Sequence, residues 1–127
     1  MENKIRLNAE LVVAEMQKIS DIDFGYNAQS VAWLDGYIER QRARPDMNQE
    51  FINSLVSVLG SYLGECVIKC YGGYWNEDGG QWQVCFNDGN CVYPFNKVRK
   101  QFEHGAGAGD SISSLFESIP LVFAKYM

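Results

Sequence analysis

Long apolar runs are absent from this sequence, and none approaches the roughly 18 consecutive residues that a helix needs to cross a bilayer. The N-terminal segment, MENKIRLNAELVVAEM, also lacks the apolar stretch and the small-residue cleavage site of a secretory signal. We therefore expect a cytoplasmic protein with no membrane partner. Disulfides are rare in that reducing compartment, so the four cysteines are expected to be free thiols.

Basic residues are few, and they do not form a patch of their own. The chain has 11 Lys and Arg against 16 Asp and Glu, which gives a formal net charge of -5. Nucleic-acid surfaces need clustered, unopposed Lys and Arg to neutralise phosphates. The composition therefore argues against a nucleic-acid partner and predicts that any protein partner is basic or neutral.

The positions of the cysteines do not indicate a metal site. If residues 66–71 form a strand, Cys66 and Cys70 lie about 13 Å apart along it. A two-residue turn at Asp88-Gly89 would place Cys85 and Cys91 on opposite faces of a hairpin. The four side chains then cannot meet at one ion. We predict no metal and no cofactor, with the cysteines acting as small, half-buried hydrophobic residues.

Histidine is almost absent, since His104 is the only one. A histidine base needs a nucleophile and an orienting carboxylate, and Asp110, Ser111 and Ser113 follow closely in the sequence. The alternative, which we adopt, is that His104 lies in the last turn of a helix, where a protonated imidazole suits the negative end of the helix dipole. The chain carries no nucleophile elbow or other catalytic signature, so no catalytic residue is predicted.

What the sequence does contain is the composition of a folded domain, with 46% hydrophobic and 13% aromatic residues in a length of 127. Apolar periodicity predicts three helices, over residues 8–19, 28–42 and 48–64. In the third helix the apolar side chains fall in one arc, and polar or small residues occupy the other. That second face would let another helix or a partner approach closely, and it includes Asn53, Ser57, Gly60 and Gly64.

After residue 65 the apolar residues alternate with polar ones, as in a sheet with one buried face. Three antiparallel strands are predicted, over residues 66–71, 81–86 and 91–95. Residues 76–80 connect the first two strands, residues 87–90 form a hairpin turn, and short helices follow over 96–104 and from residue 110 or 111 to just before Pro120. The predicted fold is α+β and forms a single domain over residues 1–127. N-terminal helices pack on a small three-stranded antiparallel sheet, and short C-terminal helices follow.

Acidic and aromatic residues gather between residues 65 and 96. Loops that connect strands lie at the surface, where side chains can meet a partner. Carboxylates there would steer a basic protein toward the chain, and a tryptophan would supply the buried anchor of the interface. We therefore predict a partner-binding surface formed by Tyr74, Trp75, Glu77, Asp78 and Asp88.

Several short segments resemble a known family. They are Trp33 to Ile38, Gly72-Gly73-Tyr74-Trp75, Pro94-Phe95-Asn96-Lys97-Val98 and the stretch from Gly105 to Ile112. Together they resemble a family of small bacterial proteins known only as a domain of unknown function. The resemblance spans roughly residues 25–117 and implies helices that precede a short antiparallel sheet. It implies no established activity and no catalytic residues.

Three functions follow as hypotheses. The first is a protein-binding module, most concretely an immunity protein that blocks the active site of a bacterial toxin, by analogy of size and charge. The second is a small-molecule-binding protein or an enzyme, with a pocket near Trp75, Trp82 and Glu77. The third is a subunit that self-associates, for example as a homodimer, through the small-residue face of the third helix. A deep pocket with convergent polar groups would favour the second hypothesis.

Overall fold

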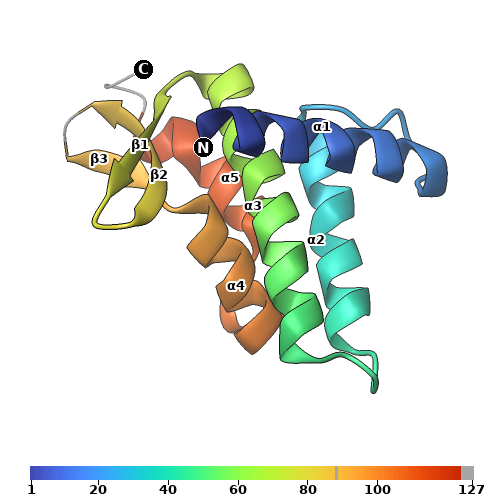
Figure 1. Ribbon diagram of the computed structural model, residues 1–127. Coiled ribbons are helices and arrows are strands. Elements are labelled where there is room, and N and C mark those ends of the chain that lie inside the picture. Colours follow the sequence, from blue (N-terminus) through green and yellow to red (C-terminus); the bar gives the residue numbers. More distant parts are fainter. Residues whose placement is uncertain (88, 124–127) are drawn as a thin grey trace.

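The computed structural model describes residues 1–87 and 89–123 (Figure 1). Within these residues the chain forms five α-helices, one short 3-10 helix and a three-stranded antiparallel sheet with strand order β1-β2-β3. The predicted α+β fold is confirmed, because three helices precede the sheet and the remaining helices follow it. The elements are α1 (Glu2–Ile19), α2 (Ala28–Arg42), α3 (Gln49–Tyr71), β1 (Tyr74–Asp78), β2 (Gln81–Asn87), β3 (Asn90–Val92), α4 (Pro94–His104), η1 (Ala106–Ala108) and α5 (Ile112–Val122).

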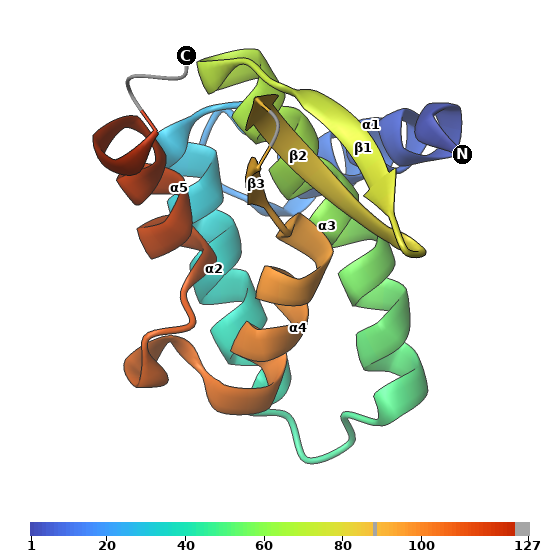
Figure 2. The ribbon, with the colours of Figure 1, turned by 90° about the vertical axis from the view of Figure 1, so that its left-hand side faces the viewer.

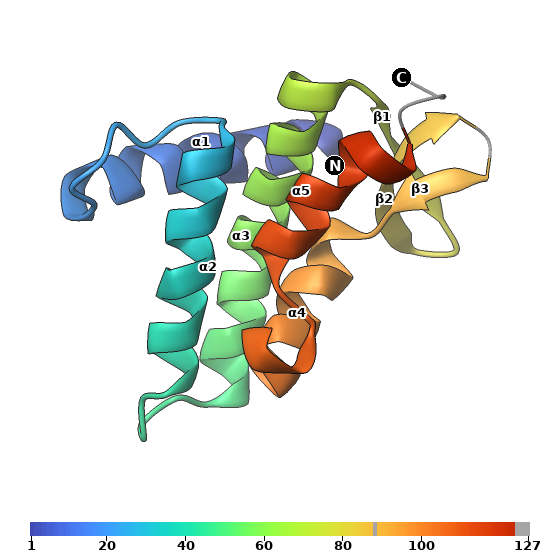
Figure 3. The ribbon, with the colours of Figure 1, turned by 180° about the vertical axis from the view of Figure 1, so that it is seen from behind.

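The central element of the fold is α3. It packs against α1, α4 and α5 and against the sheet through β2, whereas α2 packs against α4 and α5. Figures 1 and 3 show α2 and α3 running antiparallel, with α1 crossing near one end of α3 and the sheet at that same end. Buried residues from all five α-helices and from the sheet form one continuous hydrophobic cluster.

The α3 helix is longer than predicted and takes the place of the first predicted strand. The interpretation of residues 66–71 as a strand is wrong, because the helix continues to Tyr71 and ends at Gly72, whose positive φ of 90° suits glycine. The error has a physical reason. All residues from Leu59 to Val67 are buried, so this part of the helix has no polar face that would reveal its period.

Among the described residues, α3 is the one helix that is long and apolar enough to cross a bilayer. However, 56% of its most apolar stretch is buried inside the fold, as in the core helix of a globular domain. The packing of the other helices around α3 therefore accounts for its apolar composition.

The sheet begins later than predicted and is smaller. β1 reaches Asp78, so the predicted connection over residues 76–80 is reduced to a turn at Gly79 and Gly80, both with positive φ. β3 ends at Val92 because Pro94 begins α4 at its first position, where the missing N–H is not needed. The strand predicted to reach residue 95 is therefore wrong. The prediction that the last helix stops before Pro120 is also wrong. This proline lies in the last turn of α5, where it removes only one helical hydrogen bond.

A disulfide between Cys85 and Cys91 joins β2 to β3. The predicted register, which places these two cysteines on opposite faces, is wrong, and so is the prediction of four free thiols. A register shift between Cys85 and Asn87 leaves Phe86 as an extra residue in β2, so that Cys85 pairs directly with Cys91. Cys66 and Cys70 remain free thiols.

The small-residue face of α3 is not the open surface that the sequence predicts. A Cβ atom on Gly60 would overlap the ring of Phe95, and one on Gly64 would overlap the ring of Trp75. The two glycines therefore let β1 and the start of α4 lie directly against α3. The chain itself therefore covers this part of the helix. Ser57, one turn earlier, is exposed.

We expect Gly64→Ala to destabilise the fold by roughly 1–3 kcal/mol, because the added methyl group meets the Trp75 ring in a close-packed interior. Gly36→Ala in α2 is the matched control. Its Cβ would meet only the end of the Arg40 side chain, and alanine favours a helix over glycine by about 1 kcal/mol. The control should therefore be neutral or stabilising. Urea unfolding measures both free energies, and equal effects of the two substitutions would contradict this packing.

The disulfide predicts a specific thiol count. Protein purified without reductant and then denatured should react with a thiol reagent at two cysteines, Cys66 and Cys70, and at four after reduction. Reduction should also lower the free energy of unfolding by about 2–4 kcal/mol, since the cross-link restricts the unfolded chain. Four reactive thiols before reduction would show that the cross-link does not form.

Candidate functional site

A pocket of about 400 Å³ lies between the beginning of α1, the first half of α3, the β1–β2 turn and the beginning of α4. Figure 2 shows the start of α1, the β1–β2 turn and α3 on the same side of the molecule. Fifteen residues line the pocket: Met1, Lys4, Ile5, Asn8, Asn53, Val56, Ser57, Ser61, Gly80, Gln81, Trp82, Tyr93, Phe95, Asn96 and Arg99.

Helical spacing determines which side chains reach the pocket. On α3 the residues Asn53, Ser57 and Ser61 recur at intervals of four, so they lie one above another on a single face. Lys4 and Asn8 have the same spacing on α1. Each helix thus contributes one polar strip, and the strips converge on the same space.

Aromatic side chains form the apolar wall of the pocket. Trp82 and Phe95 line it, and both rings rest on Trp75 behind them, with ring centroids 6.4 Å and 5.8 Å from the Trp75 centroid. Trp75 is held in turn by a hydrogen bond of 2.7 Å from its Nε1 to Oε2 of Glu65. Because Gly64 admits the Trp75 ring, the position of this wall is set by α3.

Two cationic side chains, Lys4 and Arg99, are also part of the lining. Arg99 Nη1 donates to Asn53 Oδ1 at 3.1 Å, and that oxygen also accepts from Gln49 Nε2 at 3.0 Å. Asn53 thus orients the guanidinium and uses one of its five N–H donors. Among the described residues, neither Arg99 nor Lys4 has a carboxylate within ion-pair distance, whereas Arg6 and Lys97 do.

One lining residue has an unsatisfied donor. In the described part of the chain, Trp82 Nε1 is the one buried side-chain nitrogen or oxygen without a hydrogen-bond partner. A buried, unpaired donor costs roughly 1–3 kcal/mol. Native structures contain few such groups, and they call for an explanation. Trp82 itself is one of the residues that line the pocket.

The structure describes four of the five residues of the predicted partner surface, and one of these four is buried. Tyr74 is 46% exposed, and Glu77 and Asp78 are exposed as well. These residues belong to β1 and not to a loop that connects strands. Trp75 is only 8% exposed, so its interpretation as a surface anchor is wrong. It alternates inward along the strand and packs on α3. Asp88 lies outside the described residues.

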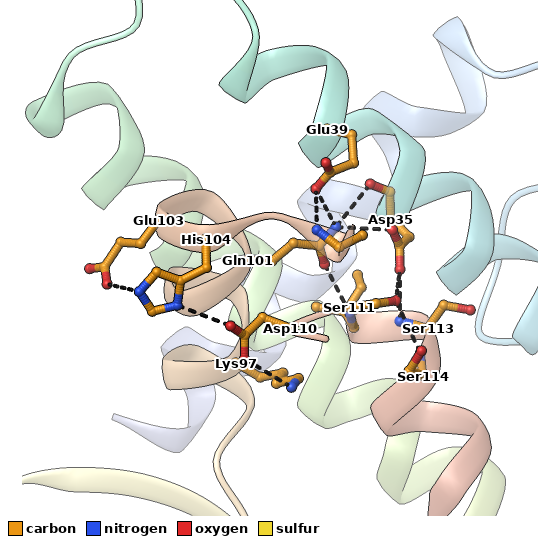
Figure 4. Close-up of polar contacts among 12 residues, drawn as sticks. Asp35, Glu39, Lys97, Gln101, Glu103, His104, Asp110, Ser111, Ser113 and Ser114 are labelled. Carbon is orange, nitrogen blue, oxygen red and sulfur yellow. Dashed lines mark hydrogen bonds and ion pairs between the residues drawn. The ribbon is translucent and has the colours of Figure 1, made fainter. Parts of the chain in front are cut away.

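A separate polar network centres on Gln101 of α4, which is fully buried (Figure 4). Its Nε2 donates to Oδ1 of Asp35 at 2.9 Å and to Oε2 of Glu39 at 3.0 Å. Its Oε1 accepts from the backbone N–H of Ile112 at 2.9 Å. This one side chain therefore joins α2, α4 and α5.

The two carboxylates of α2 also hold the segment that leads into α5. Asp35 accepts from the hydroxyl of Ser111 and, at 3.0 Å, from the backbone N–H of Ser113. Glu39 accepts from the backbone N–H of Ala106 at 3.1 Å. Because the groups satisfy one another, we assign the network to fixing the C-terminal segment.

His104 ends α4, and more than half of its side chain is exposed (Figure 4). Its Nδ1 lies 3.0 Å from Oδ2 of Asp110, and its Nε2 lies 3.9 Å from Oε2 of Glu103. The hydrogen bond from His104 is the main reason that the pKa of Asp110 lies below its ordinary value. The nearby Ser111 hydroxyl bonds to Asp35 instead, so it is not positioned as a nucleophile for this histidine.

Cys66 is not a reactive thiol, and the described cysteines belong to no metal-binding cluster. Burial is the main cause that raises the pKa of the Cys66 thiol to about 12, so it stays protonated at neutral pH and is a poor nucleophile. In residues 1–87 and 89–123 there is no group of three His, Cys, Asp or Glu side chains that could hold a metal ion.

Sequence reasoning missed most of the pocket. Among the lining residues, the small-molecule hypothesis includes Trp82 alone. The pocket joins residues from four separate parts of the chain, so no local motif marks it. The signal that could have pointed to it is the pair of glycines in α3, which indicates close packing of large side chains. No family model, curated protein or solved structure matches this chain, so its resemblance to a family of unknown function stays a prediction.

Proposed function

We propose that this protein binds a small organic molecule in the pocket between α1, α3, the β1–β2 turn and α4. The observation that carries the proposal is the convergence of polar groups from three helices on a pocket that also has an aromatic wall. Pockets for small molecules usually measure roughly 300–1,000 Å³ and combine apolar walls with a few placed polar groups. The volume of about 400 Å³ and the composition of this pocket both agree with that description.

The lining favours binding rather than catalysis. It contains no histidine, cysteine, aspartate or glutamate, which are the side chains that most often act as general acids, general bases or nucleophiles. The hydroxyl of Ser61 already donates to the backbone oxygen of Ser57 at 2.7 Å. We therefore propose a binding protein without catalytic residues in this pocket.

Filling the pocket should abolish ligand binding. Ser57→Phe puts a large side chain into the pocket from an exposed position on α3, so the fold should tolerate it. Ser54→Phe is the matched control, because Ser54 is exposed on the same helix but does not line the pocket. In a thermal-shift screen of small metabolites, a compound present at 100 times its Kd should stabilise the wild-type protein by about 2.7 kcal/mol.

The stabilising compounds should lose their effect on the Ser57→Phe variant and keep it on the Ser54→Phe variant. A screen in which no compound stabilises the wild-type protein would contradict the proposal. So would compounds that stabilise both variants equally, because they would bind elsewhere.

A second candidate function is the binding of a basic protein, for example a toxin blocked by an immunity protein. It is favoured by the exposure of Tyr74, Glu77 and Asp78 on β1, which is an edge strand of the sheet. An edge strand offers unpaired backbone groups, and its acidic side chains would attract a basic surface. Tyr74 would take the anchoring role that the buried Trp75 cannot fill.

Charge reversal distinguishes this second candidate. Once a basic partner is found by pull-down, Glu77→Lys combined with Asp78→Lys should slow its association roughly tenfold or more, because steering by opposite charge is lost. Asp21→Lys combined with Asp23→Lys changes the net charge equally at exposed positions away from β1 and is the control. Stopped-flow association rates measure the effect. Equal slowing by both pairs would place the contact surface elsewhere.

A further inference from the structure

We infer that the ligand of this pocket is a planar organic anion, an aromatic ring system that carries a carboxylate, sulfonate or phosphate group. The inference rests on the proposed function and adds the chemical class of the ligand. Its anionic group would meet Lys4 and Arg99, and its ring would lie along Trp82 and Phe95.

The first argument is the charge of the lining. The chain has 16 acidic residues and a net charge of -5, yet none of the acidic residues that the structure describes lines the pocket. Glu77 pairs with Trp82 across the sheet but is not part of the lining. A cationic ligand would need carboxylates to neutralise it, and this pocket offers none. The two charged side chains in its lining, Lys4 and Arg99, are both cations.

The second argument is that these cations are uncompensated within the described chain. Arg6, Lys18, Arg42, Arg44, Lys69 and Lys97 all have a carboxylate within 4.0 Å. Among the described Lys and Arg residues, four have none: Lys4, Arg40, Arg99 and Lys100. Lys4 and Arg99 are the two of these four that line the pocket. Two like charges that face one space repel each other, and a bound anion would relieve that repulsion.

The third argument is the fixed position of Arg99. Its Nη1 is held by Asn53, whose oxygen is shared with Gln49, so the guanidinium is oriented before any ligand arrives. A planar guanidinium presents paired N–H donors that match the two oxygens of a carboxylate or a sulfonate. Amide side chains of Asn8 and Asn96 in the same lining add neutral donors.

The fourth argument is the shape of the apolar wall. Trp82 and Phe95 are supported by Trp75, which is itself hydrogen-bonded and fitted against Gly64. The aromatic rings are therefore held in place and can pack against a flat ring system without first being ordered. A ligand with both a flat apolar part and an anionic group would contact both the aromatic and the cationic residues of the lining.

Two probes with the same aromatic skeleton test the inference. 8-Anilinonaphthalene-1-sulfonate carries a sulfonate, and N-phenyl-1-naphthylamine lacks it, while both fluoresce more strongly in an apolar site. The wild-type protein should bind the sulfonate probe at least roughly tenfold more tightly than the neutral one, because a hydrogen bond to a charged group contributes that much. Raising the salt concentration should weaken binding of the sulfonate probe alone.

Two double variants locate the effect. Lys4→Gln combined with Arg99→Gln should remove the preference for the sulfonate while leaving the Kd of the neutral probe unchanged. Arg6→Gln combined with Lys100→Gln removes the same charge outside the pocket lining and should keep the preference. Circular dichroism confirms that each variant is folded.

The possible outcomes separate the inference from the proposed function. If both probes bind the wild-type protein with equal Kd and neither binds the Ser57→Phe variant, the pocket binds ligands but the assignment of an anion is wrong. If the two double variants lose the preference equally, Lys4 and Arg99 are not the recognising groups, and the inference fails. If neither probe binds, or if Ser57→Phe leaves their binding unchanged, the inference fails, and the screen of small metabolites tests the proposed function separately.

Discussion

The close contact between α3 and the aromatic residues opposite it is the constraint on which the rest of the structure depends. Gly60 and Gly64 leave room on the helix for Phe95 and Trp75, and a side chain at either glycine would collide with a ring. Trp75 then bonds to Glu65, so the sheet is attached to the helix by both packing and a buried hydrogen bond. The distance between the sheet and α3 decides whether a pocket exists, because Trp82 and Phe95 form its wall.

The parts of the fold that sequence reasoning could predict are those with a clear period or a clear end signal. Helix α2 has one buried stripe of Val31, Leu34 and Ile38. Asn27 precedes the helix and caps it, since its side chain accepts from Ser30 N at 2.8 Å. Its predicted bounds therefore agree with the structure. The second half of α3 could not be recognised in the same way, since it is buried on all sides and its apolar run is equally typical of a strand.

The predictions of the sheet and of the site are wrong for two reasons. Some contacts join residues that are far apart in the sequence, and one extra residue shifts the register between β2 and β3. One extra residue, Phe86, changes which residue lies opposite Cys85 and so turns a predicted pair of free thiols into a disulfide. In the sequence, Trp75 looks like a surface anchor because Glu77 and Asp78 follow it. In the structure its side chain points toward α3, the helix that precedes β1, and packs against Gly64. The pocket has no local pattern because its lining is assembled from α1, α3, α4 and the β1–β2 turn.

Charge is distributed in a way that separates the two candidate functions. Acidic side chains are exposed on β1, whereas the pocket beside the same hairpin is lined by Lys4 and Arg99 and by no acid. A net charge of -5 would repel anions from the protein as a whole, so an anionic ligand would have to be recognised at short range by these two groups. A basic protein partner would instead contact the acidic side chains of β1 and could bind without entering the pocket.

The central claim is that the pocket beside Trp82 is where a ligand binds. Nuclear magnetic resonance of the ¹⁵N-labelled protein, titrated with 8-anilinonaphthalene-1-sulfonate, tests it most directly, because each tryptophan indole N–H gives its own signal. We predict that the indole signal of Trp82 moves together with the backbone signals of residues 53–61 and 95–99, while the signal of Trp33 on α2 stays in place. A titration that moves the signals of Trp33 or of residues 74–78 and leaves Trp82 unchanged would contradict the account.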